Sequence, residues 1–428
     1  MLAVQDEIPI GRFGRQHRNS EAMELVGKKP SDHGWHNFSH TVVFSHGGLS
    51  PEGWQELATA VSGMDILKIT SIVLKDIRLQ SEGCCALTEI VRTSKSLDKL
   101  HIRHSPGTIP TDPFRELANA VAGSSSLTSL SLVRCNLEPD GWSFVSDIVR
   151  QTTHIQELDL GSSNVGSEGC AAIAEAIKRN TILRSLTISK NIGPNGHLVL
   201  AEALKVNTAL TTLNLSHHLI SLKGWEALAR GLSGNRSMTT LSLRDAIICP
   251  RGWEILLEWL KTGSSLKKIN LHGKSRKKDE WVAFAKVLVD NDCLTDIDVS
   301  GDGPIARGAD VVDILRAFAE ALDVNTTVQR IHFPAGSNTA TSRRTFLQFP
   351  AGFGNSRSRG AWSSIQLSLL LNRAGRKRLL CSRDPSLPVR DSEWVDALVC
   401  CSNSVPAIFF FLSARPELVA KSVLQQSL

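Results

Sequence analysis

Hydrophobic positions recur along most of the chain with the spacing L-x-x-L-x-L. The pattern begins at Ile69 and returns at positions 97, 127, 155, 183, 210, 238, 266, 294 and 328, so that all but the last two starts lie 27 to 30 residues apart. A weaker copy precedes them at Thr41–Phe44. Short alternating apolar runs predict strands. A fixed period of this length predicts a solenoid of structural repeats.

Each period continues with a glycine and an amphipathic stretch that predicts a helix. In one period this stretch presents Cys170, Ile173, Ala174 and Ile177 at helical spacing. The shared glycines are Gly53, Gly83, Gly141, Gly169, Gly196, Gly224 and Gly252. The helices are expected to end at Gly123, Asn180, Asn207, Asn235, Gly263, Asn291 and Asn325. Because Gly and Asn tolerate the left-handed conformation, we expect the helices to end in it.

One such period cannot bury its own apolar face, so stacked periods are expected to form a parallel sheet with helices behind it. We predict an α/β solenoid (horseshoe) of about ten strand–helix repeats of ~28 residues, followed by a small α-helical C-terminal tail. The expected domains are a loose N-terminal segment or cap at 1–40, the solenoid at 41–334, a Ser/Gly/Arg-rich linker at 335–361 and the helical tail at 362–428.

The stretch from Ile155 to Ile177 reads IQELDLGSSNVGSEGCAAIAEAI. It resembles the ribonuclease-inhibitor subclass of leucine-rich repeats, which also occurs in NOD-like receptors. The resemblance covers about residues 41–334 and implies the fold rather than a function. In that subclass one position of the turn after the strand is usually Asn or Cys. Several repeats of this chain have other residues at that position, and we expect looser turns there. The position holds Cys135 and Asn191, but also Ser163, His218, Ala246, Lys274 and Asp302.

The strand residues between the leucines are expected to line the inner face of the solenoid. Most are Ser or Thr and none is aromatic, which fits a solvated sheet face. The sharper hypothesis is a partner surface anchored by basic residues, because arginine is enriched among binding hot spots. Its candidates, with the lysines opposite Asp296 and Asp298, are Arg103, Arg134, Arg184, Arg244, Lys267 and Lys268.

Tryptophan is concentrated at one position of the repeat. Five of the nine Trp residues fall in the first turn of a predicted helix, namely Trp54, Trp142, Trp225, Trp253 and Trp281. A buried indole row between strands and helices is one interpretation. An exposed aromatic patch that binds a partner is the other.

The net charge of +6 is unevenly distributed. From Pro334 onward there are twelve Lys/Arg and five Asp/Glu, which gives +7, so residues 1–333 sum to −1. A basic, partly apolar tail could meet a membrane surface. Nucleic acid is disfavoured, because the aromatic–basic interleaving of RNA readers is missing. The alternative partner-binding residues are therefore Arg373, Arg376, Lys377 and Arg378.

The sequence predicts no catalytic residue, metal, cofactor or small-molecule substrate. Nucleotide-binding and hydrolase motifs are missing. His36 and His40 could share a helical face, but the segment leads into a strand, which argues against a metal site. The chain has nine cysteines and no CxxC pair, and its first residues lack the apolar core of a secretion signal. We therefore expect a cytoplasmic protein whose cysteines are reduced thiols.

We therefore expect a non-enzymatic scaffold that binds a protein partner on its curved repeat surface. A first alternative is a regulator of a small GTPase, since GTPase-activating relatives are built on this repeat. Those relatives carry an acidic tail, whereas the tail here is basic. A second alternative is a membrane-surface adaptor that acts through the basic tail. The sequence leaves the oligomeric state open.

Overall fold

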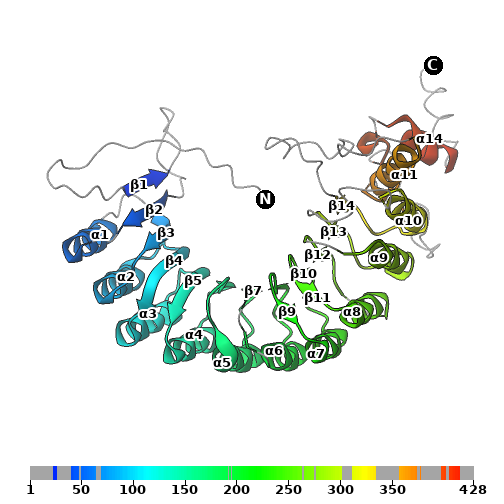
Figure 1. The fold of residues 1–428 in the computed structure, drawn as a ribbon. Coiled ribbons are helices and arrows are strands. Elements are labelled where there is room, and N and C mark those ends of the chain that lie inside the picture. Colours follow the sequence, from blue (N-terminus) through cyan, green and yellow to red (C-terminus); the bar gives the residue numbers. More distant parts are fainter. Residues whose placement is uncertain are drawn as a thin grey trace, which may run out of the picture. The chain divides into compact units, whose positions relative to one another are not determined.

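A computed structural model gives the architecture of the chain (Figure 1). It describes residues 23–26, 40–47, 50–63, 69–190, 192–193, 195–262, 265–273, 276–300, 311–333, 356–373, 376, 397–401 and 404–414. The chain forms two compact units. Unit 1 comprises Met1–Met238 with Ile247–Cys249, and unit 2 comprises Thr239–Ala246 with Pro250–Leu428.

Unit 1 alternates strands and helices. Its sheet runs in the order β1 (Met23–Val26), β2 (His40–Gly47), β3 (Ile69–Ile77), β4 (Lys99–Ile109), β5 (Ser129–Leu137), β6 (Glu157–Asp159), β7 (Ser185–Thr187) and β8 (Thr212–Asn214). Strand β1 pairs antiparallel with β2, and the later pairs are parallel. The helices are α1 (Pro51–Gly63), α2 (Ser81–Thr93), α3 (Thr111–Gly123), α4 (Pro139–Gln151), α5 (Gly166–Arg179), α6 (Gly196–Val206) and α7 (Leu222–Ser233). Strands β9 (Leu219–Ile220) and β11 (Ile247–Ile248) form a separate parallel pair.

Unit 2 continues the alternation. Its parallel sheet runs β10 (Thr240–Ser242), β12 (Lys268–Asn270), β13 (Asp296–Asp298) and β14 (Arg330–His332). Its helices are α8 (Pro250–Thr262), α9 (Lys278–Asp290), α10 (Val311–Val324), α11 (Ser356–Arg373) and α14 (Val405–Ala414). The expected α/β repeat solenoid with a helical C-terminal part is confirmed.

The leucine pattern forms the core between sheet and helices. The second apolar residue of each strand is buried, as at Leu100, Leu158 and Leu213, and the helices contribute residues such as Ile173. In each unit the strands lie along one side of the array and the helices along the other (Figure 1). Burial of these aliphatic side chains supplies most of the stabilisation, at roughly 25 cal/mol per Å² of apolar surface.

A ladder of buried asparagines joins successive repeats at the helix ends. The Asn207 side-chain amide donates to the carbonyl oxygens of Ile177 (2.8 Å) and Asn180 (3.0 Å) in the preceding repeat. Its Oδ1 accepts from the N–H groups of Ala209 and Leu210. Equivalent bonds are made by Asn180, Asn235, Asn291 and Asn325.

The expectation of left-handed helix ends is wrong. The residue after α5, Asn180, has φ −75° and ψ 130°, and Asn207 after α6 is also extended. Asparagine is favoured here because its side chain bonds to backbone groups on both sides, so its tolerance of positive φ is not used.

The left-handed conformation occurs instead two residues beyond the last residue of the L-x-x-L-x-L pattern, which is within β3, β4 and β5 and beyond the end of the shorter strands. Asp76, His104, Arg134, Ser162, Lys190, His217 and Asp245 all have φ between 52° and 65°. The expectation of looser turns is not met at Ser163 and His218. Ser163 Oγ donates to Leu132 O at 2.6 Å, and His218 Nε2 lies 2.8 Å from Ile188 O. A hydroxyl or an imidazole thus replaces the usual Asn or Cys. At Ala246 the side chain cannot form such a hydrogen bond, and Lys274 and Asp302 lie outside the described residues.

The five tryptophans of the repeat are buried, at 2–4% exposure, so the hypothesis of an exposed aromatic patch is wrong. Each indole lies in the first turn of its helix, and two of them occupy the space beside the glycine of the next repeat. A Cβ on Gly83 would lie 2.8 Å from Trp54, and one on Gly169 would lie 2.9 Å from Trp142. At these two positions the shared glycine is explained by the aromatic side chain stacked against it.

Candidate functional site

The inner face of unit 1 is built from residues that alternate with the buried leucines. On β4 these residues are Lys99, His101 and Arg103. Since Leu100 and Ile102 point into the core, the three side chains share the opposite face. Lys99 and Arg103 are exposed, and neither side chain has an ion pair among the residues that the structure describes.

Strand β5 separates this basic row from an acidic one. Parallel pairing puts Ser129 beside Lys99 and Ser131 beside His101. On the other side of β5, Glu157 lies beside Ser129 and Asp159 beside Ser131. Because neighbouring strands are about 4.8 Å apart, the basic and acidic rows stand roughly 10 Å apart.

Two half-buried groups modulate the charge of this surface. Burial lowers the pKa of His101, and the neighbouring Arg103 and Lys99 lower it further. Burial raises the pKa of Asp159, although the N–H of Gly161, which donates to its Oδ1 at 2.9 Å, and Arg103 partly offset this shift. Both pKa shifts favour the neutral form of the group concerned.

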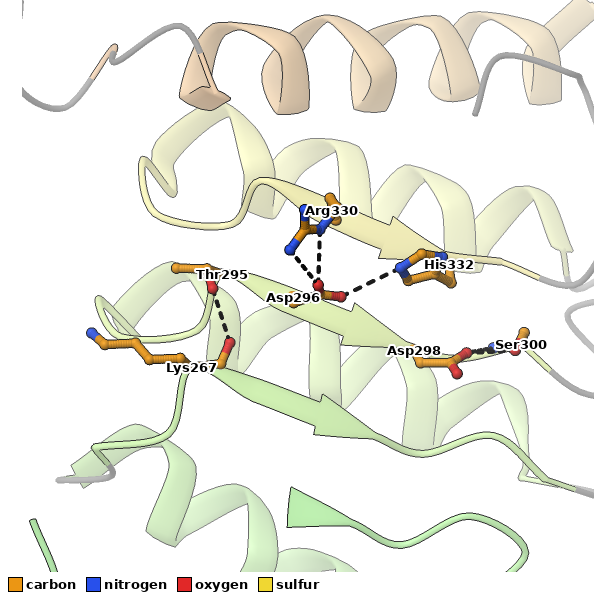
Figure 2. A network of polar contacts seen from close by, with 7 residues as sticks. All are labelled: Lys267, Thr295, Asp296, Asp298, Ser300, Arg330 and His332. Atoms are coloured by element: carbon orange, nitrogen blue, oxygen red, sulfur yellow. Dashed lines mark hydrogen bonds and ion pairs between the residues drawn. The ribbon is translucent and has the colours of Figure 1, made fainter. Parts of the chain in front are cut away.

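The inner face of unit 2 carries a polar network across β12, β13 and β14 (Figure 2). Arg330 Nε and Nη2 both lie 2.8 Å from Asp296 Oδ2, and His332 Nε2 lies 3.4 Å from Asp296 Oδ1. In the next row, Asp298 Oδ1 accepts from the N–H and the hydroxyl of Ser300. The carboxylates of this surface are thus already engaged within the chain.

The network shifts the pKa values of both titrating partners. Burial by itself would raise the pKa of Asp296, but the bond from His332 and the adjacent Arg330 outweigh it, so the pKa is lowered. The same bond raises the pKa of His332 against the effect of its burial. Unit 2 therefore presents a neutralised cluster, in contrast to the separated charges of unit 1.

Comparison with known proteins identifies the repeats. Residues 151–174 and 206–229 match the leucine rich repeat family model. These two stretches are leucine-rich repeats. A search of curated proteins found no match.

Solved structures resemble the chain at low sequence identity. The chain is similar to leiomodin-1 actin-binding site 2, with 16% identity, 48% of this chain and 90% of that chain covered, and a TM-score of 0.27. A chain of the yeast Rad7 and Elc1 complex is 14% identical, with 72% and 88% covered and a TM-score of 0.31. Superposition this loose carries no argument about function.

The six inner-face residues predicted from the sequence are all exposed, but they occupy different positions of the leucine-rich repeat. Arg103 lies on the inner face of unit 1, whereas Arg184 lies just before β7 and its Nη1 donates to Ala209 O at 2.9 Å. Arg134 lies within β5 but has a left-handed backbone conformation. In unit 2, Arg244 lies 3.5 Å from Asp245, Lys268 is exposed on β12 and Lys267 is exposed just before it.

The predicted opposition of lysines and aspartates takes another form. Lys268 is registered beside Asp296, but the ion pair that holds Asp296 comes from Arg330 on the following strand. Sequence reasoning missed Arg330 and His332. The signal was present, because the repeat that begins at Val328 places them at the positions of Asp296 and Asp298.

The four basic residues predicted in the tail differ in their placement. Arg373 is exposed at the end of α11, and Lys377 and Arg378 lie outside the described residues. Arg376 is only 7% exposed, and its guanidinium donates to Asp323 O at 2.8 Å. We therefore correct the prediction for Arg376, which packs against the end of α10 and is not presented to a partner.

The described residues offer neither a metal-binding cluster nor a membrane-spanning helix. They contain no group of three or more His, Cys, Asp or Glu side chains arranged to hold a metal ion. Of the two histidines weighed from the sequence as metal ligands, His36 lies outside the described residues and His40 begins β2. None of the described helices combines the length and the apolar character needed to cross a bilayer.

Proposed function

We propose that the chain is a non-catalytic scaffold that binds a protein partner on the inner face of its leucine-rich repeats. The observation that carries the proposal is the set of exposed, separated charges on β4 and β6 of unit 1. Parallel strands over a close-packed core hold these side chains at fixed spacing. Fixed, complementary charges favour specific and fast association with a protein surface.

The rigidity of the repeat supports binding without large rearrangement. The buried asparagine ladder ties each helix end to the preceding repeat, as Asn235 does through Leu204 O (2.7 Å) and Asn207 O (2.9 Å). A preorganised surface loses little conformational entropy on association. The partner then meets a surface whose shape is already set.

The finer assignments belong to the same proposal. We place the repeats in the ribonuclease-inhibitor subclass, supported by full helices of eleven to fourteen residues such as α5 and α6. We place the protein in the cytoplasm, supported by Cys84, Cys135 and Cys170, whose thiols are reduced. Disulfides are rare in that reducing compartment.

Site-specific photo-crosslinking of the full chain in an extract of its source cells tests the proposal. A benzophenone amino acid is placed at Thr212 on the inner side of β8, and for comparison at the exposed Glu202 on α6. We expect a discrete protein adduct from position 212, at least several-fold stronger than from position 202. Equal adducts, or adducts from the helix position alone, would contradict binding on the inner face.

A further inference from the structure

A strip across β4, β5 and β6 has features that a merely solvated sheet face does not require. We call it the dipolar strip and define it by Lys99, Arg103, Ser131, Glu157 and Asp159. Its basic and acidic ends stand on β4 and β6, two strands apart. Among the described residues, Lys99, Arg103 and Glu157 form no ion pair, although opposite charges lie on the same face.

The centre of the strip contains an unsatisfied hydroxyl. Ser131 is 3% exposed, and its Oγ is buried without a hydrogen-bond partner. Strand alternation puts this side chain on the inner face, because its neighbours Leu130 and Leu132 point into the core. A buried hydroxyl without a partner costs free energy. A bound molecule that forms a hydrogen bond with the hydroxyl would remove this cost in the complex.

Short, buried side chains of β5 lie between the two charged rows. Ser129 and Ser131 are the β5 residues in register with the charged positions of β4 and β6. Ser129 Oγ lies 3.4 Å from His101 Nε2, so its polar group has a neighbour within the chain. Ser131 does not, and the centre of the strip is therefore its least satisfied point.

We propose that the dipolar strip binds an extended segment of a partner protein that carries an acidic side chain and a basic side chain. The acidic side chain meets Lys99 and Arg103, the basic one meets Glu157 and Asp159, and the backbone or a polar side chain between them pairs with Ser131 Oγ. This inference rests on the proposed function and adds the chemistry of the partner.

A segment of one sign alone fits the strip less well. A wholly acidic segment would meet Glu157 and Asp159, and a wholly basic one would meet Lys99 and Arg103. Like charges brought together at an interface suppress the wrong partner. The spacing of roughly 10 Å between the rows corresponds to about three residues of an extended chain.

Selection of displayed random peptides on the immobilised full-length chain tests the proposal. Wild-type protein is expected to enrich peptides in which an acidic and a basic residue lie two to four positions apart. Lys99→Glu with Arg103→Glu should remove the acidic residue from the enriched set. Glu157→Lys with Asp159→Asn should remove the basic one, and the amide introduced by the second change keeps an acceptor for the Gly161 N–H.

The controls repeat each type of charge change elsewhere in unit 1. Arg179→Glu at the end of α5 and Glu168→Lys in its first turn alter helix residues away from the strip. Both should enrich the same peptides as wild type. Circular dichroism and thermal unfolding confirm that each variant is folded before selection.

Ser131→Ala separates binding from structure. The variant should bind the selected peptide about three- to tenfold more weakly, the effect of one lost hydrogen bond. Its thermal stability should be unchanged or raised, since the unsatisfied hydroxyl is removed. Unchanged affinity would show that Ser131 does not contact the segment and would overturn its place in the strip.

The outcomes distinguish this inference from the proposed function. Enrichment that shifts with the charge of each row supports the inference. Enrichment of one peptide set by wild type and by both strip variants overturns it. No enrichment by wild type also overturns the inference, and in either case the crosslinking at position 212 then decides the proposed function separately.

Discussion

Two buried histidines occupy positions that other repeats fill differently. His197 stands in the first turn of α6, where the next repeat has Trp225, and His218 stands in the turn position of Cys135 and Ser163. Their rings meet edge to face with centroids 5.0 Å apart. Since a carbonyl oxygen only accepts, His218 Nε2 donates to Ile188 O. Neutral imidazoles thus serve as core side chains.

This pair makes the stability of unit 1 dependent on pH. Burial lowers the pKa of His197 to about 4 and also lowers that of His218, to which the neighbouring His217 adds. In the unfolded chain a histidine titrates near pH 6.5. Above that pH both states are neutral and stability is complete. As the pH falls from 6.5 toward 4, only the unfolded chain takes up the protons, so stability is lost.

We therefore expect His197 to lower the free energy of unfolding between pH 6.5 and 4 by up to about 1.4 kcal/mol per pH unit, with His218 acting in the same direction. Urea unfolding at pH 7.5, 6 and 5 measures the loss. His197→Phe keeps an aromatic ring without a titrating group and should give a shallower pH dependence. The exposed His154→Gln is the control. Equal slopes for wild type and His197→Phe would show that this histidine does not carry the effect.

At the scale of elements, helix stacking depends on close backbone contact at chosen positions. Gly231 of α7 faces the carbonyl group of Ala201 in α6. An added Cβ would lie 2.3 Å from Ala201 O, a distance that only movement of one helix can relieve. By contrast, a Cβ on Gly123, the last residue of α3, would meet nothing within 4 Å.

Gly231→Ala is expected to destabilise unit 1 by about 1–3 kcal/mol, the usual cost of forcing extra volume into a packed contact. Gly123→Ala should be neutral or slightly stabilising, because alanine is the better helix residue and has space. Chemical unfolding of both variants measures the difference. If Gly231→Ala unfolds no more easily than Gly123→Ala, α6 and α7 separate without cost and the close contact is unimportant.

The strands and helices could be predicted because buried apolar residues recur with the same period as these elements. Leu213 and Leu241 stand in the predicted strands and are buried as expected. What the period could not predict is the use of polar residues. The sequence does not show whether an asparagine after a helix adopts a positive φ or forms hydrogen bonds to the preceding repeat. Asn207 does the latter. That choice is made by contacts with Asn180, 27 residues away.

At the scale of the whole molecule, the sequence also did not predict how the last repeat ends. The run from Arg373 to Arg378 reads as one basic segment, but the structure assigns its described members different roles. Asn372 of α11 donates to Asn325 O (3.0 Å) and Val328 O (2.8 Å), which extends the asparagine ladder beyond the last repeat. Ser368 Oγ lies 3.3 Å from Asp323 Oδ1. Helix α11 thus covers the exposed end of unit 2, as a terminal cap must.

Arg376 completes this cap and removes a charge from the tail surface. Its guanidinium donates to the carbonyl oxygens of Leu322 (3.4 Å), Asp323 (2.8 Å) and Asn325 (3.4 Å). Carbonyl groups at the end of a helix have no partner within it. The hypothesis of a membrane-binding basic tail is weakened accordingly, since one of its four named residues is engaged in folding.

Arg376→Ala should therefore destabilise the C-terminal end of unit 2 by about 1–3 kcal/mol, the cost of leaving buried polar groups unsatisfied. Amide hydrogen exchange of the full chain should show faster exchange in α10 and α11, with the amides of α2 and α3 in unit 1 unchanged. Arg373→Ala removes the same charge from an exposed position and is the matched control. If both variants exchange like wild type, the guanidinium contributes nothing to the cap, and Arg376 returns to the set of residues that a membrane or an acidic partner could use.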